Sequence, residues 1–406
     1  MTTTADSTAP SATERVSAED ARALRDVVRR FVADEVLPRV ADYDREERLP
    51  EDLLARLGQL GFTGGTIPLE WGGNGFDHRT HSMVIEEMSR GCHLLATIAS
   101  MPSGLVGAGI LKYGTPEQKQ RWLLPLATGE IFGAAGVTEP QSGSDVAGLQ
   151  TSYRRDGDEF VLNGRKAWIS NLDIASFFVT LATRDRSLRH RGITAFIIPA
   201  DTPGLSVHPY KNKLGFRPLS TGDVVLDEVR LGPDAVLGDI DRGFFAAMTG
   251  VERGRLGVAA RSVGVAQSCL DESVRYAKQR IIAGQAIANL QIVQSKITDM
   301  IVGVEAARAL VNLAADALDA GKVARREVGM AKMYASDVAM RSATDAIQIH
   351  GAYGTSPDFP VSRHFRDAKV LQIVEGSNDL HRGMLAEMAL GLRSEAENRS
   401  SVDRST

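Results

Sequence analysis

The sequence contains little cysteine and no long apolar segment. Only Cys92 and Cys269 occur among its 406 residues. They form no CxxC pair and no metal-ligand spacing, which predicts a reducing compartment and no structural zinc. No stretch offers ~18 uninterrupted apolar residues for a membrane span. Residues 1–16 lack the basic and then apolar order of a secretory signal. These absences predict a cytoplasmic protein with no membrane partner.

An excess of charge of one sign is also lacking. The chain has 47 Lys and Arg against 51 Asp and Glu, a net charge of −4, which is too balanced to predict binding to nucleic acid or to anionic lipid. The composition, 43% hydrophobic and 24% charged, is typical of a globular protein and not of a disordered or collagen-like chain. At ~100–200 residues per domain, the length predicts two to four domains.

Several nucleotide and metal motifs are missing. The sequence has no GxxxxGK[ST] loop, no HExxH, and no GxGxxG that leads from a strand into a helix. P-loop ATP hydrolysis, zinc proteolysis and a Rossmann nicotinamide site therefore lose support. The glycines between Gly104 and Gly109 lie in a helical context, and we interpret them as sites of close packing.

The residue pattern divides the chain into three regions. Residues 17–130 are predicted to be helical, starting at a capping sequence, Ser17-Ala-Glu-Asp20. Residues 131–240 contain short β-rich runs with no helical pattern between them, which predicts a small antiparallel sheet or barrel. Asn163-Gly164 between two apolar runs predicts a hairpin turn. Helices return over residues 241–393, and residues 1–16 and 394–406 are expected to be a disordered leader and tail.

The C-terminal region contains one long apolar seam at 4-3 spacing. Its members are Val293, Ile297, Met300, Val304, Ala307, Val311, Ala314 and Leu318. Gly321 then provides a helix stop. Such a seam packs either inside a bundle of one subunit or between subunits, and the sequence favours the bundle.

One stretch suggests a ligand. Residues 136–145 (GVTEPQSGSD) supply many neutral hydrogen-bond donors, and the segment Trp168-Ile-Ser170 supplies an aromatic plane. This combination suits a planar heterocycle with polar edges better than a metal. Taken alone, it is also compatible with a Gly/Ser-rich loop beside a buried tryptophan.

The order of motifs along the chain resembles the acyl-CoA dehydrogenase family of flavoproteins from Ser17 to Leu392. The motifs are the VTEP-x-SGSD loop, WIS, Arg280, the QIHGAYG run and IVEG. The resemblance implies a mostly α fold with a central β-domain: an N-terminal helical domain, a middle antiparallel β-domain and a C-terminal four-helix bundle. It also implies FAD, a homotetramer built as a dimer of dimers, an acyl-CoA or acyl carrier protein thioester as substrate, and an electron-transfer flavoprotein as electron acceptor.

The resemblance places the catalytic base at Glu375. Forming the enoyl thioester requires a base to remove the α-proton while the β-hydride leaves for flavin N5. The apolar neighbours of Glu375 in residues 370–376 can desolvate the carboxylate and raise its pKa toward working pH. The family has a second placement of the base, which corresponds here to Gly254 and therefore offers no side chain.

The remaining site residues are also carried over from the resemblance. The flavin is expected to contact Val137, Thr138, Trp168, Ile169, Ser170 and Ser377, with Arg280 and Gln291 from the neighbouring subunit and Gln348 and Gly351 near the adenosine and pyrophosphate. The substrate-binding residues are expected to be Ser144, Glu252, Arg255 and Gly376. No metal ligand is expected.

Three departures from the family pattern keep other functions open. Ala283 replaces an aromatic residue, Ala352 replaces a second glycine, and His381 replaces an amide with an imidazole that can become charged near neutral pH. They hint at a branch that acts on carrier-bound acyl groups in biosynthesis. The alternatives are an oxygen-reactive acyl oxidase or flavin monooxygenase, and a non-catalytic scaffold whose FAD site has decayed.

Overall fold

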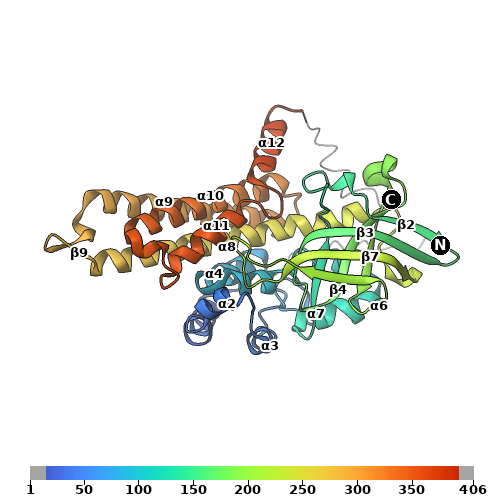
Figure 1. Cartoon of the computed structure of the whole chain (residues 1–406), viewed down its shortest axis with the longest axis horizontal. Helices are drawn as coiled ribbons and strands as arrows, with labels where there is room; N and C mark the ends of the chain where they lie inside the picture. Colours follow the sequence, from blue (N-terminus) through green and yellow to red (C-terminus); the bar gives the residue numbers. More distant parts are fainter. Residues whose placement is uncertain (1–14, 393–406) are drawn as a thin grey trace, which may run out of the picture.

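The computed structural model describes residues 15–392 (Figure 1). Helices precede and follow a central sheet, so the predicted mostly α fold with a β-domain is confirmed. The expected leader lies outside the described residues except for residues 15–16, and the expected tail lies wholly outside them.

The N-terminal region is helical, as predicted. Its α-helices are α1 (Ala18–Phe31), α2 (Val40–Glu46), α3 (Glu51–Gln59), α4 (His78–Ser100), α5 (Gly107–Tyr113), α6 (Pro116–Gln118) and α7 (Leu124–Thr128). The Ser17 hydroxyl accepts a hydrogen bond from the backbone N–H of Asp20, which confirms the predicted cap of α1. Helix α4 is almost wholly buried and packs against the C-terminal bundle.

The middle region forms one sheet. Its strands are β1 (Phe132–Gly136), β2 (Ser152–Asp156), β3 (Glu159–Ser170), β4 (Ala175–Thr183), β5 (Ile193–Pro199), β6 (Leu205–Pro209), β7 (Thr221–Leu231) and β8 (Val236–Leu237). The order is β6-β7-β3-β2-β4-β5-β8, with β1 paired to β4. Most pairs are antiparallel as expected, but β1 runs parallel to β4, and β2 pairs with β4 in parallel at one position.

The predicted hairpin turn at Asn163-Gly164 is wrong, because β3 continues through both residues. The register of β3 against β7 shifts here instead, which marks a bulge. The Asn163 side chain accepts from the backbone N–H of Glu228 on β7 at 2.9 Å. A Cβ on Gly164 would lie 2.5 Å from the Thr151 hydroxyl. This glycine therefore serves a close approach between strands, and the chain reverses earlier, at Gly157.

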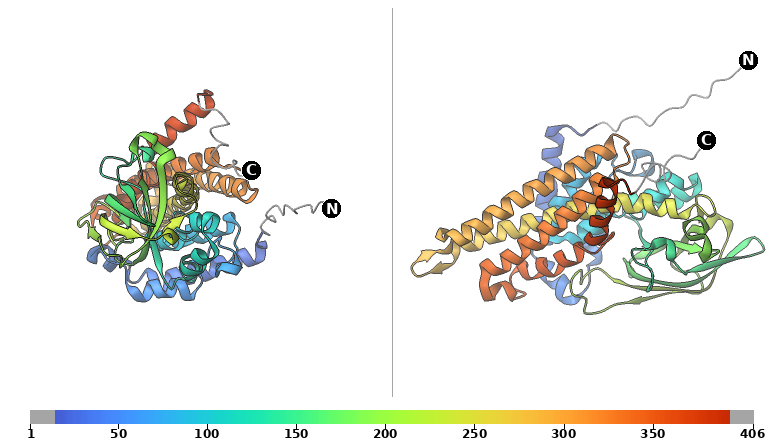
Figure 2. Two further views of the ribbon diagram at one scale, coloured as in Figure 1. Left: turned by 90° about the vertical axis from the view of Figure 1, so that its right-hand side faces the viewer. Right: turned by 90° about the horizontal axis from the view of Figure 1, so that it is seen from above.

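The C-terminal region contains the long helices. They are α8 (Gly243–Gln279), α9 (Gln291–Asp319), α10 (Arg325–His350), α11 (Pro360–Leu371) and α12 (Asn378–Ala389), with the short hairpin β9 (Ile281–Ile282) and β10 (Gln285–Ala286) between α8 and α9. Helices α8, α9 and α10 run side by side away from the sheet (Figure 2). The seam of α9 packs within this bundle, and Gly321 follows with φ +68°, so the bundle prediction is confirmed.

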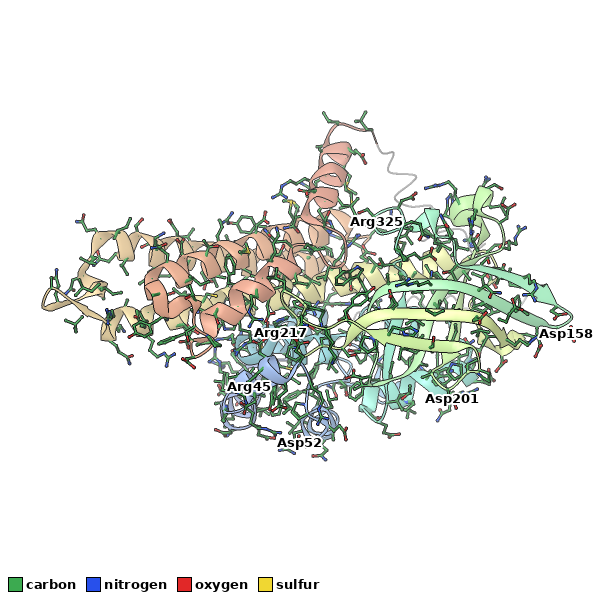
Figure 3. All side chains as sticks on the ribbon, viewed as in Figure 1. Arg45, Asp52, Asp158, Asp201, Arg217 and Arg325 are labelled. Atoms are coloured by element: carbon green, nitrogen blue, oxygen red, sulfur yellow. The ribbon has the colours of Figure 1, made fainter. Side chains whose placement is uncertain are left out.

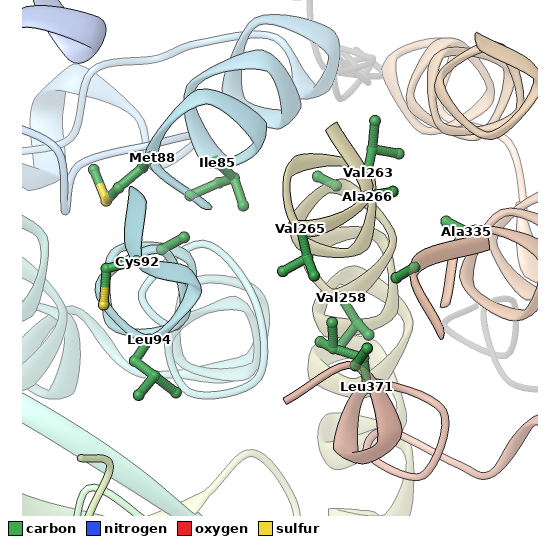
Figure 4. Packing of buried hydrophobic residues seen from close by; sticks show 14 of the residues in the cluster. Ile85, Met88, Cys92, Leu94, Val258, Val263, Val265, Ala266, Ala335 and Leu371 are labelled. Atoms are coloured by element: carbon green, nitrogen blue, oxygen red, sulfur yellow. The ribbon is translucent and has the colours of Figure 1, made fainter. Parts of the chain in front are cut away.

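Apolar side chains fill the space between α4 and the bundle. Ile85 and Leu94 of α4 and Val265 of α8 belong to this core, and Leu371 of α11 joins it (Figure 4). Both cysteines are buried and free. Within residues 15–392, no helix is long and apolar enough to span a membrane.

Most charged side chains lie on the surface, as at Arg45, Asp52, Asp158 and Asp201 (Figure 3). Lys166, Arg261 and Lys332 are exceptions, since each exposes 4% of its surface or less. Burying a charge is costly unless something compensates it. Each of these three cations therefore needs hydrogen-bond acceptors or an anion near it.

Candidate active site

A tight turn between α11 and α12 positions Glu375. Glu375 has φ +56° and Gly376 has φ +95°, and a non-glycine residue adopts such a left-handed conformation only when its surroundings hold it there. Two cations provide that hold. Arg255 of α8 donates from Nε to the carbonyl of Glu375 at 2.8 Å, and Lys332 of α10 donates to the carbonyl of Gly376 at 2.8 Å.

Lys332 is a buried cation of this site that was not predicted from the sequence. Its ammonium is fully buried and also donates to Asn378 Oδ1 at 2.9 Å and to the carbonyl of Gln372 at 3.2 Å. Burial lowers the pKa of Lys332, and the three acceptors compensate its charge. The signal in the sequence was a lone lysine on the otherwise small and apolar face of α10.

The carboxylate of Glu375 lies against Gly254 of α8. A Cβ on Gly254 would be 2.7 Å from Oε1 and 3.2 Å from Oε2 of Glu375. The two positions at which the resemblance allowed a base therefore share one place in the structure. The missing side chain of Gly254 provides the room that the Glu375 carboxylate fills.

Burial raises the pKa of Glu375 to about 7, although Arg255, Arg261 and Lys332 act in the opposite direction. A carboxylate with such a pKa can take and return a proton near neutral pH. Glu252 lies close to this site, one turn before Arg255 on α8. Burial raises its pKa, and its Oε1 has no hydrogen-bond partner among the described residues.

The β-domain presents a second group of predicted residues. Val137 and Thr138 follow β1, and the carbonyl of Thr138 accepts from the backbone N–H of Ala167 at 2.9 Å. The loop after β1 is therefore joined to the end of β3, where Trp168, Ile169 and Ser170 lie. The two motifs that the sequence linked to one ligand are neighbours in space.

A buried ion pair holds that loop, and the sequence analysis missed it. Lys166 of β3 donates to Glu139 at 2.7 Å, and both side chains are almost fully buried. Glu139 also accepts from the backbone N–H groups of Gln150 at 2.6 Å and Thr151 at 2.9 Å. Burial lowers the pKa of Lys166 to about 8, and the interaction with Lys166 helps to lower that of Glu139. In the sequence, this ion pair was indicated by the glutamate of the VTEP motif, Glu139.

Trp168 is not buried, so the alternative of a loop beside a buried tryptophan is wrong. The residue is 63% exposed and has φ +59°. Its ring lies edge-on to Tyr210, with centroids 4.8 Å apart. Ser144 is also exposed, in the loop that Glu139 anchors. A strained backbone that presents an indole to solvent is typical of a ligand-binding surface.

A third group lies far from Glu375 within the same chain. Arg280, Gln291, Gln348 and Gly351 are all exposed. The first of them caps α8, 25 residues after Arg255, and a helix rises by about 1.5 Å per residue, so roughly 40 Å separate the two positions. Figure 1 shows β9 at this end of the bundle, opposite the sheet. One chain alone does not bring this group to the Glu375 site.

Two of the three departures from the family pattern, Ala283 and His381, have defined surroundings. Ala283 (φ +49°) and Gly284 (φ +80°) form the two-residue turn between β9 and β10. His381 is fully buried on α12, and burial lowers its pKa to about 3, so the expectation that it becomes charged near neutral pH is wrong. Neither ring nitrogen makes a well-aligned hydrogen bond within the described chain. Ser377 caps α12 by accepting from the N–H of Leu380.

Comparisons with known proteins agree with this arrangement. Three family profiles match, described as the acyl-CoA dehydrogenase N-terminal domain over residues 18–130, the middle domain over 134–229 and the C-terminal domain over 241–390. The chain is 39% identical to the mitochondrial short-chain specific acyl-CoA dehydrogenase of Bos taurus, over 89% of this chain and 88% of that protein.

Solved structures are similar along their whole length. Butyryl-CoA dehydrogenase from Megasphaera elsdenii has a TM-score of 0.89 and 34% identity, covering 93% of this chain and 100% of that one. The prolyl acyl carrier protein oxidase AnaB has a TM-score of 0.88 and 30% identity, covering 92% and 100%. Among residues 15–392, no cluster of His, Cys, Asp and Glu side chains has the arrangement of a metal site.

Proposed function

Because the chain belongs to the acyl-CoA dehydrogenase family of FAD-dependent oxidoreductases, which act on CH–CH groups, we propose that it dehydrogenates an acyl thioester between Cα and Cβ with Glu375 as the base. The observation that carries the proposal is the Glu375 carboxylate itself, buried against Gly254 with its pKa raised to about 7. A base with this pKa is ionised for a large part of the time near neutral pH and still accepts a proton readily.

The residues of the chain suit FAD. Trp168 presents an exposed ring beside the loop of Thr138, whose carbonyl accepts from the backbone N–H of Ala167. We infer that Val137, Thr138, Trp168, Ile169, Ser170 and Ser377 hold the flavin of one subunit. When bound, FAD supplies the acceptor for the β-hydride. These contacts speak against a scaffold with a decayed site.

Arg280, Gln291, Gln348 and Gly351 are proposed to meet the FAD of a second copy, because they are too far from Glu375 of their own chain. Exposed apolar side chains surround this end of the bundle, with Ile281 at 55%, Ile282 at 51% and Tyr353 at 54% exposure. Such exposure is typical of a surface that another subunit covers. A homotetramer built as a dimer of dimers would complete four sites.

The chain's own residues carry the proton step. Lys332 and Arg255 fix the backbone of Glu375 and Gly376, so that the carboxylate faces the substrate with little freedom. Glu375 takes the α-proton, while Ser144, Glu252, Arg255 and Gly376 bind the thioester. The substrate carrier is CoA or an acyl carrier protein, and the similarity to a carrier-protein oxidase supports testing both. An electron-transfer flavoprotein is the proposed electron acceptor, and oxygen is the alternative.

An anaerobic titration tests this function. The purified holoenzyme is mixed with short, branched, aromatic and dicarboxylic acyl thioesters, on CoA and on a carrier protein. We expect at least one to bleach the flavin absorbance. Hydrogen peroxide on aerobic turnover would indicate an oxidase. Failure of every thioester to bleach the flavin would contradict the proposed dehydrogenation, and a colourless protein that binds no added FAD would restore the scaffold hypothesis.

A further inference from the structure

Arg261 lies in the interior of the bundle without an acidic partner. It is on α8 and exposes only 4% of its surface. Nε donates to the carbonyl of Gly257 at 3.3 Å, and one terminal nitrogen donates to the hydroxyl of Thr97 on α4. No carboxylate of residues 15–392 lies within 4 Å of this guanidinium.

The guanidinium is incompletely satisfied. A guanidinium has five N–H donors, and the two bonds to Gly257 and Thr97 use two of them. Burial lowers the pKa of Arg261 to about 10, which still leaves it charged at neutral pH. The Glu375 carboxylate interacts favourably with this charge but makes no hydrogen bond to it. If this site binds an anionic ligand, the presence of Arg261 in the core is explained.

Arg261 faces the same side of α8 as the catalytic centre. Seven residues separate it from Gly254, and seven residues are close to two helical turns. Gly254 touches the Glu375 carboxylate, and the Nε bond to Gly257 leans the Arg261 side chain back toward it. Glu375 raises the pKa of Arg261, and Arg261 in turn lowers the pKa of Lys332, so these three charged groups lie within reach of one another.

The wall beside Arg261 is polar and tight. The Ser100 hydroxyl donates to the carbonyl of Thr97 at 2.9 Å, and a Cβ on Gly257 would meet Ser100 at 3.4 Å. An acyl chain whose α-carbon lies at Glu375 and which runs along α8 therefore ends among hydroxyl groups and a cation. A methyl end would offer no acceptor to the remaining N–H groups of Arg261.

We propose that the acyl group oxidised at this site is short and carries a carboxylate at its far end, which pairs with Arg261. The substrate is then the monothioester of a dicarboxylic acid, and the terminal carboxylate passes unchanged through the reaction. This inference rests on the proposed function, since it names the substrate class of the same site.

The test compares glutaryl-CoA with the methyl ester of its free carboxylate, which lacks the terminal charge and is larger by one methyl group. In the wild-type holoenzyme we expect kcat/KM for glutaryl-CoA to exceed that for the ester at least tenfold, because a hydrogen bond to a charged group contributes roughly 1.5–3 kcal/mol. Arg261→Gln should remove this ratio or reverse it. Arg261→Lys, which keeps the charge, should retain part of it.

Two controls keep the result specific. Arg363→Gln removes another buried arginine, which is 9% exposed and lies beside His364 and Asp367. Arg363 is not among the groups that shift the pKa of Glu375. This variant should leave the ratio of the two kcat/KM values unchanged. The melting temperature of Arg261→Gln is measured as well, to show that the variant is folded. An equal rate with both thioesters in the wild type, or an unchanged ratio in Arg261→Gln, would overturn the proposal.

Binding separates this inference from the proposed chemistry. Calorimetry on the Glu375→Gln holoenzyme measures Kd for both ligands without turnover. Tighter binding of glutaryl-CoA that depends on Arg261 supports the carboxylate site. If the wild type then oxidises neither ligand, that result contradicts the proposed dehydrogenation but not the carboxylate site. Oxidation with no charge preference in rate or Kd sustains the function and overturns the inference.

Discussion

At the scale of single residues, Glu375 is balanced between burial and three cations. Burial favours the neutral acid, and Arg255, Arg261 and Lys332 favour the carboxylate. Burial outweighs the cations, which leaves the pKa near 7 instead of its ordinary value of 4.5. A base in bulk water with a pKa of 4.5 would be a poorer proton acceptor. The apolar packing around the turn therefore matters as much for reactivity as the carboxylate itself.

Replacing Glu375 by Gln should separate binding from chemistry. The amide fits the same volume but cannot accept the α-proton. We expect FAD content and thioester affinity close to those of the wild type and a loss of turnover on the order of 10²–10⁴-fold, the usual contribution of a general base. Single-turnover bleaching measures this step directly. Near-normal bleaching would remove Glu375 from the mechanism.

The raised pKa of Glu375 also predicts a pH-dependent stability. The folded state holds this proton up to about pH 7, whereas the unfolded chain releases it near 4.5. The favourable contribution is complete below 4.5 and is lost as pH rises through 7, by on the order of 3 kcal/mol. Urea unfolding of the wild type and Glu375→Gln at pH 5 and pH 8 should show the wild type losing more stability between them. Parallel losses in both proteins would mean an ordinary pKa.

Replacing Gly254 by Ala adds one methyl group next to the Glu375 carboxylate. A Cβ there would lie 2.7 Å from the Glu375 carboxylate, so Gly254→Ala must displace it. A small displacement of a reacting group can cost about 10²-fold in rate, and we expect a loss of that order in kcat. Gly383→Ala on α12 is the matched control, since its Cβ meets nothing within 4 Å. Equal rates in both variants would show that the carboxylate position is not critical.

At the scale of elements, the turn between α11 and α12 depends on a neighbouring helix. Lys332 of α10 bridges Gln372, Gly376 and Asn378, and Arg255 of α8 holds Glu375 from the other side. The local sequence of the turn does not by itself favour a positive φ at a glutamate. Its conformation is imposed by the bundle.

Lys332→Met should therefore loosen the turn. The Gly376 carbonyl loses its donor, whereas the Gln372 carbonyl keeps the backbone N–H of Asn378 and Asn378 Oδ1 keeps the Ser336 hydroxyl. One buried acceptor left unsatisfied costs roughly 1–3 kcal/mol, so we expect the free energy of unfolding to fall by about that amount. Loss of this cation should also move the pKa of Glu375 upward, which shifts the rise of kcat/KM to higher pH. Lys369→Met on α11 is the exposed control and should change stability by less than about 0.5 kcal/mol.

The sequence was more informative about some elements than others. The seam of α9 and the Ser17 cap could be predicted because local spacing decides them. The turn at Asn163-Gly164 could not, because the pairing of Asn163 with Glu228 on β7 decides it. Glu375 and Trp168 were predicted as site residues from family motifs and stay predictions, whereas Lys166, Lys332 and Arg261 were not predicted. Buried charges are recognisable only when the acceptors around them, or their absence, can be seen.

At the scale of the whole molecule, the predicted FAD residues fall into two distant groups. Trp168 and Thr138 lie at the sheet, whereas Arg280 and Gln348 lie at the far end of the bundle. A single ligand cannot contact both in one chain across roughly 40 Å of α8. If both groups bind FAD, two copies must be arranged so that the end of one bundle reaches the sheet of the other. This arrangement makes each site a property of a pair of subunits.

Complementation between two inactive variants tests this sharing. Arg280→Gln should bind FAD poorly, because it removes a cation that can pair with a phosphate, and Glu375→Gln should bind FAD but not turn over. In a mixed dimer, one site combines Glu375 of one chain with Arg280 of the other. Random pairing makes half of the dimers mixed, so coexpression should restore about a quarter of wild-type activity. Flavin content of the purified mixture measures the same recovery. Activity no higher than that of either variant alone would show that Arg280 does not serve the site of a second chain. Normal flavin content in Arg280→Gln alone would show that Arg280 has no part in binding FAD.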